Sequence, residues 1–457
     1  MVSRDTLKEL RKEGFILIPR ACKTTEGYLL EEVFKNGAFW YLHFNRGTKQ
    51  IEYMEYFIEG DRAYIPVEDF DGIEHHQLYL GQKPMEYGST EELRREILEF
   101  IPQWVDYSPK FVELDSYYVF LTWLYDRLPV VPYRRALGEV GSGKSRWAET
   151  VGGLCRLGFK QGATATAPGV FRKNHYYQGT QIFDENEYNV ASSEVMSAIN
   201  LVLNSGYSET TGMVTRLVGA LYLPQGYYTF GPKLIAARTR TGNIATESRI
   251  ITNRSYKSNA IPREYNKDFF ITAQKLRNKL LKWRLDNYEI ELTRNKEFDI
   301  GAIKRSIDPR LLEVTGAITK FIPPSNMETL RALKDVLVHN NEMYKAVREI
   351  SMEAACLRGL LAVMERAEPL TMGRISKHLD SKEEETLALP WTARRVGIIF
   401  RNQLDLIIKQ QYNRVDDNRV ATLLWTEENK QELKRRFRDF ELDTEDNIKI
   451  VDNYTVV

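Results

Sequence analysis

An eight-residue motif constrains what this chain can fold into more than any other feature of its sequence. Residues 138–145 read GEVGSGKS and match the spacing GxxxxGK[ST] at every fixed position. The apolar residues Ala136 and Leu137 precede the motif, and SRWAETVGGLCRL follows it with helical spacing. In a strand, glycine loop and helix of this kind, backbone N–H groups and the positive end of the helix dipole surround phosphate groups. The motif therefore predicts an α/β fold with a site for a nucleoside triphosphate.

The residue types in the motif suit ATP and Mg²⁺. We expect Lys144 to reach the β and γ phosphates, and the hydroxyl of Ser145 to ligate Mg²⁺. A glycine-rich turn without a ligand is the alternative, which the flanking strand and helix disfavour. The predicted nucleotide-binding residues lie in the loop and the first turn of the helix: Gly138, Gly141, Gly143, Lys144, Ser145 and Arg146.

A second segment predicts hydrolysis of the bound nucleotide. Residues 179–189, GTQIFDENEYN, have the pattern of a short apolar strand that ends in two adjacent carboxylates, Asp184 and Glu185. A nucleotide hydrolase needs one carboxylate near magnesium and one that activates the attacking water. We assign Asp184 to magnesium and Glu185, as a catalytic base, to the water. Acidic pairs at strand ends are also common as solvated turns, so the assignment depends on the preceding motif.

Composition indicates a folded chain of several domains. Its 457 residues suggest roughly three domains. Hydrophobic residues make up 43% of the chain and charged residues 28%, as in ordinary folded proteins. The sequence has no apolar run of about eighteen residues and no signal-peptide pattern at its start, so we expect no membrane span and a cytoplasmic protein. The formal net charge of +1 neither indicates nor excludes nucleic-acid binding.

Changes in residue pattern divide the chain into five predicted parts. Alternating apolar and polar residues indicate strands, and apolar residues at helical spacing indicate helices. The parts are a β-rich N-terminal domain (1–88), a helical connector (89–130), a P-loop ATPase core (131–262), a helical lid (263–367), and a winged-helix domain with its tail (368–457).

The last part has the element order of a small winged helix. MGRISKHLD and TARRVGIIFRNQL predict two helices, KQQYNRVDDNRVATLLW a hairpin, and TEENKQELKRRFRDF a third helix. The second helix carries Arg394, Arg395 and Arg401, which suits a recognition helix on DNA. Winged helices also bind proteins, so this pattern leaves both kinds of partner open.

From about Leu114 to Arg310 the chain resembles ring-forming AAA+ replicative helicase-like ATPases of mobile elements and phages. That group is related to minichromosome maintenance proteins and viral superfamily-three helicases. The matching segments are YRRALGEVGSGKSR, GATATAPGVFR, GTQIFDENEYN, NSGY, and FGPKLIA followed by ESRIIT. The first and third of these segments are specific to ATPases, and the others are individually weak. The resemblance implies an AAA+ core and a homo-oligomeric ring, in the form of a hexamer.

The resemblance also implies roles for two arginines outside the motif. Arg249 stands where such ATPases carry an arginine finger for the neighbouring subunit, and Arg310 resembles the second sensor arginine at the γ phosphate. The alternatives are an exposed basic residue for Arg249 and a capping or surface residue for Arg310. Arg238 and Thr239 depart from the family pattern, because relatives often place a small polar residue or Asn there. This departure leaves the first sensor unassigned.

Two regions offer contacts for DNA. Residues 213–230 resemble the hairpin that relatives project into the ring channel, with Arg216, Tyr227 and Tyr228 as contacts for a strand. Packing of this apolar hairpin against the core is the alternative. The segment 233–305 is rich in basic residues that suit a phosphate backbone, or else a solvated helix face.

These patterns favour an ATP-dependent DNA helicase or translocase that acts in replication of a mobile element or phage. A second hypothesis is a helicase loader, replication initiator or remodeller that hydrolyses ATP without processive unwinding. A third is a nucleotide-gated module that binds DNA or protein. Loss of hydrolysis in Glu185→Gln with retained binding would separate real turnover from a slow switch.

Overall fold

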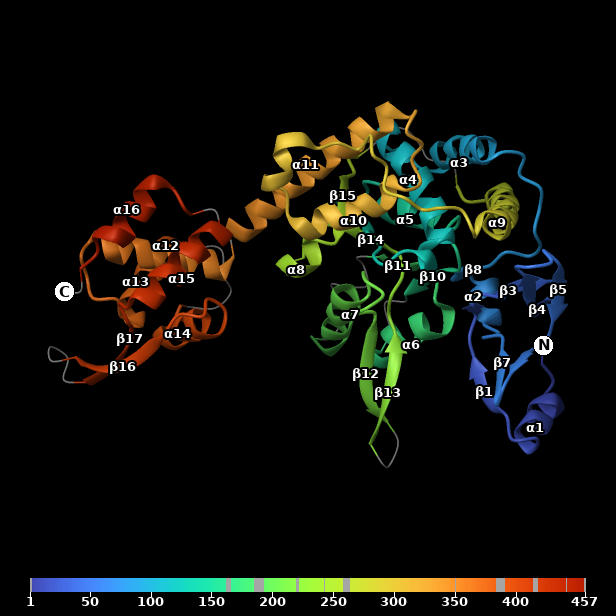
Figure 1. Ribbon diagram of the computed structural model, residues 1–457, viewed down its shortest axis with the longest axis horizontal. Coiled ribbons are helices and arrows are strands. Elements are labelled where there is room, and N and C mark those ends of the chain that lie inside the picture. Colours follow the sequence, from blue (N-terminus) through green and yellow to red (C-terminus); the bar gives the residue numbers. More distant parts are fainter. Residues whose placement is uncertain are drawn as a thin grey trace. The chain divides into compact units, whose positions relative to one another are not determined.

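The computed structural model describes residues 2–161, 166–184, 193–218, 222–241, 243–257, 264–349, 351–383, 391–413, 418–440 and 442–455. The chain forms two compact units, Met1–Asn340 and Asn341–Val457 (Figure 1). Each unit has its own hydrophobic core. The predicted five-part division remains a prediction at its finer boundaries.

A six-stranded sheet forms the centre of the first unit. Its strands lie in the order β15 (Ile250–Arg254), β9 (Tyr133–Leu137), β14 (Lys233–Ala237), β11 (Gln181–Asp184), β10 (Gly158–Gln161) and β8 (Leu78–Tyr79). Neighbouring strands are parallel except for β8, which is antiparallel to β10. Helices α5 (Lys144–Gly152), α6 (Ala167–Tyr177), α7 (Ser193–Ser205) and α8 (Ile244–Glu247) connect or flank these strands (Figure 1). The predicted mixed α/β fold with a parallel sheet and many helices is confirmed.

Two consecutive buried arginines fix strand β9, which leads into the glycine loop. Arg134 donates to Asp115 Oδ1 from Nε (2.9 Å) and Nη2 (2.6 Å). Arg135 makes a two-pronged ion pair with Glu247, both contacts 2.6 Å long. Burial alone would raise the pKa of Glu247, but Arg135 lowers this pKa to about 2. Since β-strand side chains alternate, the two pairs hold β9 from opposite faces of the sheet.

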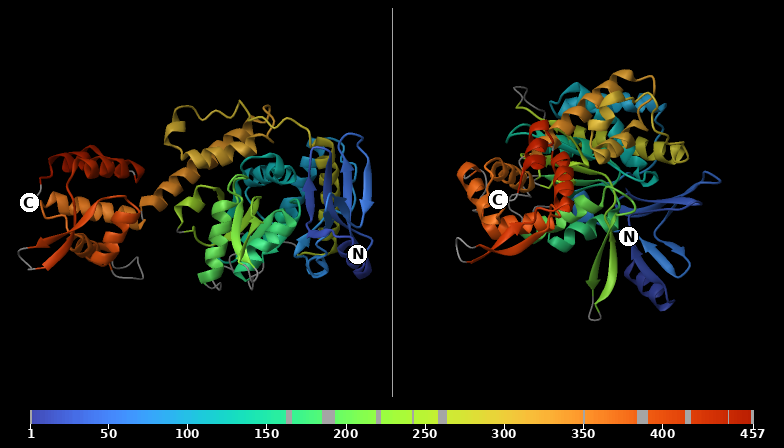
Figure 2. Two further views of the ribbon diagram at one scale, coloured as in Figure 1. Left: turned by 60° about the horizontal axis from the view of Figure 1, so that its bottom comes forward. Right: turned by 60° about the vertical axis from the view of Figure 1, so that its left-hand side comes forward.

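The N-terminal part contains two small β-sheets and is joined to the core by buried charges. Its sheets are β1–β7–β6 and β2–β3–β4–β5, and both lie apart from the central sheet (Figure 2). Glu31 on β3 accepts hydrogen bonds from Arg156 of the core (2.8 Å) and from Arg284 (2.8 Å). Asp126 accepts a further bond from Arg284 (2.7 Å). The bounds of these elements are α1 (Arg4–Lys12), β1 (Ile16–Pro19), β2 (Cys22–Thr24), β3 (Tyr28–Lys35), β4 (Ala38–Asn45), β5 (Ile51–Met54), β6 (Phe57–Glu59), β7 (Arg62–Ile65) and α2 (Phe70–Glu74).

Four of the six basic residues of helix α9 (Lys267–Asn287) have partners within the chain. Arg277 and Arg284 are buried, and the Arg277 guanidinium donates to the carbonyls of Leu80 and Gly153. Lys279 pairs with Glu96, and Lys282 pairs with Asp286 four residues on. Lys267 and Lys275 of this helix are exposed, and a role of the basic segment 233–305 in binding a phosphate backbone stays a prediction.

Further helices complete the first unit around this core. The segment predicted as a helical connector contains α3 (Thr90–Trp104), which begins with a capping box at Ser89, and α4 (Pro109–Trp123), followed by the short η1 (Tyr125–Arg127). After α9 come η3 (Gly301–Ser306), α10 (Pro309–Thr319) and α11 (Met327–Glu349), whose residues from Asn341 on belong to the second unit. Hairpin β12 (Met213–Val218) and β13 (Leu223–Tyr228) projects from the core in Figure 1 and in the right-hand view of Figure 2.

The second unit contains the expected order of helix, helix, hairpin and helix. These elements are α13 (Met372–Glu383), α14 (Ala393–Asn402), β16 (Ile408–Asn413) with β17 (Asn418–Leu423), and α15 (Glu427–Asp439). Helix α12 (Met352–Glu365), which the sequence grouped with the lid, shares their core, and α16 (Glu445–Asn453) ends the chain's helices. Within the described residues, no helix is both long and apolar enough to cross a membrane.

Candidate nucleotide site

The glycine loop after β9 has a backbone that only glycine adopts easily. Gly141 (φ 78°) and Gly143 (φ 83°) lie in the left-handed region, and α5 begins at Lys144. A Cβ atom at Gly138 would collide with the carbonyl oxygen of Ser255, which follows β15. The loop thus turns tightly at the helix N-terminus, where N–H groups and the helix dipole attract anions.

Polar groups inside the loop fit a phosphate ligand. Lys144 is 7% exposed, and its Nζ donates to the carbonyl oxygen of Glu139 (2.9 Å). Among the described residues the buried hydroxyl of Ser142 has no hydrogen-bond partner, while Ser145 is exposed. Arg146 donates to the carbonyl of Trp104 (3.2 Å). A buried orphan hydroxyl beside a lysine is what a loop built for phosphate oxygens presents before they bind.

Asp184 lies at the same edge of the sheet as the glycine loop. It ends β11, is partly buried, and pairs in register with Ala236 of β14. Strand β14 pairs on its other side with β9, so a single strand separates Asp184 from the loop. Carboxyl ends of parallel strands are the usual place for ligands in open α/β sheets. Glu185, the predicted base, lies outside the described residues.

The two arginines assigned by resemblance both lie against the ring of Tyr207. Arg249 is 6% exposed; it donates to the carbonyl of Ala245, and its guanidinium carbon lies 4.4 Å from the ring centroid of Tyr207. Arg310 lies 5.5 Å from the same ring and 3.5 Å from Ser248 Oγ. A side chain buried in its own subunit does not reach a neighbouring site, so this conformation of Arg249 does not present an arginine finger.

Of the hairpin contacts predicted for DNA, the structure exposes one. Arg216 on β12 is exposed, and its guanidinium carbon lies 5.3 Å from the ring centroid of Phe171. Tyr227 is 3% exposed and packs in a core cluster with Phe171 and Tyr133. Tyr228 is partly buried. The structure therefore corrects the prediction for Tyr227, whose ring faces the core because alternate hairpin residues point to opposite faces.

Only some of the arginines on helix α14 of the second unit are exposed. Arg394 and Arg401 of α14 are exposed, and Ile398 between them is 46% exposed. Arg395 instead turns back on its own unit, with its guanidinium carbon 5.1 Å from the ring centroid of Trp391. Residues four and seven apart share one helix face, so Arg394, Ile398 and Arg401 form one exposed stripe.

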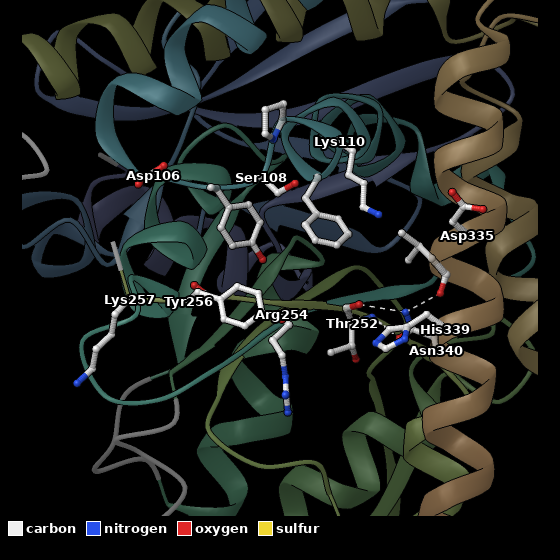
Figure 3. A pocket seen from close by; sticks show the side chains of 15 residues that line it. Asp106, Ser108, Lys110, Thr252, Arg254, Tyr256, Lys257, Asp335, His339 and Asn340 are labelled. Atoms are coloured by element: carbon white, nitrogen blue, oxygen red, sulfur yellow. Dashed lines mark hydrogen bonds between the residues drawn. The ribbon is translucent and has the colours of Figure 1, made fainter. Parts of the chain in front are cut away.

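A cavity of about 580 Å³ lies beside the end of β15 (Figure 3). Three segments line it: 106–111 between α3 and α4, 252–257 at the end of β15, and 335–340 on α11. Ser255 joins the cavity to the loop, because its hydroxyl donates to the carbonyl of Ser142. The volume lies within the usual range of small-molecule sites.

The cavity walls combine aromatic rings with fixed polar groups. Tyr107, Phe111 and Tyr256 supply the rings, and burial raises the pKa of Tyr107, which stays neutral. The Asn340 side chain accepts from the backbone N–H of Thr252 (2.7 Å) and donates to its carbonyl (3.0 Å), which ties α11 to the edge strand β15. No local pattern marks these three distant segments, so sequence reasoning missed the cavity.

In comparisons with known proteins, the chain matches solved structures but no family model and no curated protein. The apo A form of the NrS-1 C-terminal region is similar with a TM-score of 0.34, 11% identity, and coverage of 91% of this chain and 98% of that one. SCCmec type IV Cch, described as an active helicase, is similar with a TM-score of 0.40, 10% identity, and coverage of 94% and 88%. At such TM-scores these likenesses add nothing to the assignment of fold or activity.

Proposed function

We propose that this chain is a Mg²⁺-dependent ATPase that couples hydrolysis to work on DNA, as a helicase or translocase. The observation that carries the proposal is the glycine loop at the start of α5, with Lys144 in the loop and Asp184 one strand away. With a triphosphate bound at the loop, its γ phosphate would lie at the carboxyl edge of the sheet, where Asp184 supplies a carboxylate.

The nucleotide would occupy the loop and the adjoining cavity together. Its phosphates would meet the backbone N–H groups of the loop, the Ser142 hydroxyl and the Lys144 ammonium. Its base and ribose would lie in the cavity, where Tyr107, Phe111 and Tyr256 offer apolar and aromatic surface. A triphosphate and a nucleoside need two joined compartments, and Ser255 lies where the loop and the cavity meet.

Ser145 and Asp184 are the residues that would hold magnesium. When bound, the ion neutralises charge on the phosphates. Asp184 would orient the ion's water shell, and Glu185, proposed from the sequence, would accept the proton of the attacking water. Lys144 would keep the γ phosphate in place during transfer.

The case for DNA as the partner depends on exposed cations. Arg216 projects on hairpin β12–β13, and Arg394 and Arg401 share one face of α14. Such side chains suit phosphate oxygens, whose neutralisation releases counterions and makes binding salt-dependent. A hexameric ring and a role in replication of a mobile element or phage follow only from the resemblance. A loader or remodeller that hydrolyses ATP without unwinding is the second candidate.

Strand displacement from a forked duplex separates these candidates. We expect the full chain to hydrolyse ATP faster with DNA and to displace a labelled strand, and Lys144→Ala to do neither. Arg216→Ala is expected to retain DNA-independent hydrolysis but to lose most of the DNA stimulation. DNA-stimulated hydrolysis without strand displacement on any fork would favour the loader or remodeller. If the chain does not bind DNA at all, the proposal that DNA is its partner is refuted.

A further inference from the structure

Arg238 occupies a position at the phosphate end of the sheet that no assigned role explains. It follows directly after β14, the strand that lies between the glycine-loop strand β9 and the Asp184 strand β11. In register, Ala237 pairs with Leu137, and the N–H of Gly138 donates to the carbonyl of Ala237 (3.1 Å). The chain therefore leaves the sheet at Arg238 next to the first glycine of the loop.

The side chain of Arg238 reaches the glycine loop itself. Its Nη2 lies 3.9 Å from the carboxylate of Glu139, and the two side chains are 47% and 79% exposed. Lys144 Nζ donates to the backbone carbonyl of the same residue, Glu139. The cations of Arg238 and Lys144 thus converge on one residue of the loop.

The pair between Arg238 and Glu139 is easily exchanged. An exposed ion pair at this separation contributes about 0–1 kcal/mol, so a more highly charged ligand readily replaces it. A triphosphate in the loop would bring several anionic oxygens beside Glu139, and like-charge repulsion would move the carboxylate away. The planar guanidinium would then bind two phosphate oxygens at once.

On the basis of the proposed ATPase function, we infer that Arg238 is a catalytic arginine that acts on the nucleotide bound by its own chain. During hydrolysis the water oxygen forms a bond to the γ phosphorus, and the bond to the bridging β–γ oxygen breaks. ADP leaves with that electron pair, and the water's proton passes to a carboxylate base. The guanidinium of Arg238 stabilises the negative charge on the γ-phosphoryl oxygens and on the leaving oxygen.

The contrast with Arg249 supports this assignment. Arg249 is 6% exposed and is held by Ala245 and Tyr207 of its own chain, whereas Arg238 is half exposed beside the loop. Arg240, two residues on, is also engaged elsewhere, since it pairs with the buried Glu247 (3.0 Å). Arg238 is the most exposed of these three arginines, and its guanidinium lies beside Glu139 of the glycine loop.

Steady-state hydrolysis by single variants of the full chain tests the inference. Arg238→Ala is expected to lower kcat at least 100-fold while KM for ATP changes less than 5-fold. Arg238→Lys should recover only part of the rate, because an ammonium cannot form the two-pronged contact. Glu139→Gln removes only the residue that pairs with Arg238 when no nucleotide is bound, so it should lower kcat less than 5-fold. Arg62→Ala, an exposed arginine of β7 with no role in this site, is the matched control.

Failure of the proposed function and failure of this inference give different results. The first condition below concerns the proposed function, and the three after it would overturn the inference. If wild-type chain shows no hydrolysis, the proposed function itself fails. If wild type is active and Arg238→Ala keeps more than half of its kcat, the residue is not catalytic. If Arg238→Ala and Glu139→Gln fall equally, their pair has a structural role. If mixing Arg238→Ala with Lys144→Ala chains restores hydrolysis, Arg238 acts on a neighbouring subunit and not on its own.

Discussion

Replacing Asp115 by asparagine should unfold the first unit at a much lower denaturant concentration. Asp115 is fully buried on α4, where it accepts two hydrogen bonds from Arg134 and one from Trp147 Nε1 (2.7 Å). Asn keeps the shape and one acceptor but leaves the buried guanidinium without its countercharge. Removing one partner of a buried pair costs about 3–5 kcal/mol, and the retained Asn253 contact favours the lower end. That loss is a large share of a typical stability of about 5–15 kcal/mol.

Chemical unfolding followed by tryptophan fluorescence measures this effect, since Trp147 lies in the network. Glu113→Gln is the matched control, because Glu113 is on the same helix but its side chain is 36% exposed where it pairs with Arg94 (2.7 Å). Arg94 keeps its ion pair with Glu91 (2.7 Å) in this variant, so the control should shift the midpoint less than Asp115→Asn does. Equal shifts for Asp115→Asn and Glu113→Gln would show that the buried pair does not fix β9 to α4 and α5.

Three further predictions follow from contacts elsewhere in the first unit. Gly138→Ala should abolish ATP binding measured by titration calorimetry, because its Cβ meets the carbonyl of Ser255; unchanged affinity would contradict the loop geometry. Asn340→Ala should lower the free energy of unfolding by about 2–4 kcal/mol, since the backbone N–H and carbonyl of Thr252 lose their hydrogen-bond partner. An unfolding midpoint equal to that of wild type would show that the contact between Asn340 and Thr252 does not stabilise the unit. Burial raises the pKa of Glu32 to about 7 from 4.5, so stability should fall as pH rises from about 4.5 to 7. Glu32→Gln should remove that part of the pH dependence, and an unchanged pH profile would refute it.

The glycine loop was predictable because its chemistry is local. Gly141 and Gly143 require φ values that other residues avoid, and Lys144 follows them at fixed spacing, so the pattern is readable without distant contacts. The strand ending in Asp184 was predictable for the same reason. The order of two helices, a hairpin and a helix after residue 370 also followed from local periodicity and turn residues.

Features that depend on distant partners were not predictable. Arg134 and Arg135 are charged residues in a strand whose partners lie 19 residues earlier (Asp115) and 112 residues later (Glu247), and only the fold brings them together. Helix α9 reads as a basic surface, yet its Arg284 is neutralised by Glu31 from the other end of the unit. Charge counts along the sequence do not reveal such pairing.

The contacts of the hairpin and the presence of the cavity could not be predicted from the sequence, for a similar reason. Tyr227 has the composition of a base-stacking residue, but the register that pairs it with Val214 turns its ring to α6. The cavity arises where three segments far apart in sequence meet, and none of them carries a motif. In both cases the deciding information is tertiary.

Release of phosphate from ATP by the full chain tests the central proposal most directly. The assay compares wild type, Lys144→Ala and Lys8→Ala, an exposed lysine of α1, at saturating Mg²⁺ and ATP. The account predicts turnover by wild type and by Lys8→Ala, and a loss of at least 100-fold in Lys144→Ala. Equal rates for wild type and Lys144→Ala, or no turnover by wild type with or without DNA, would contradict it.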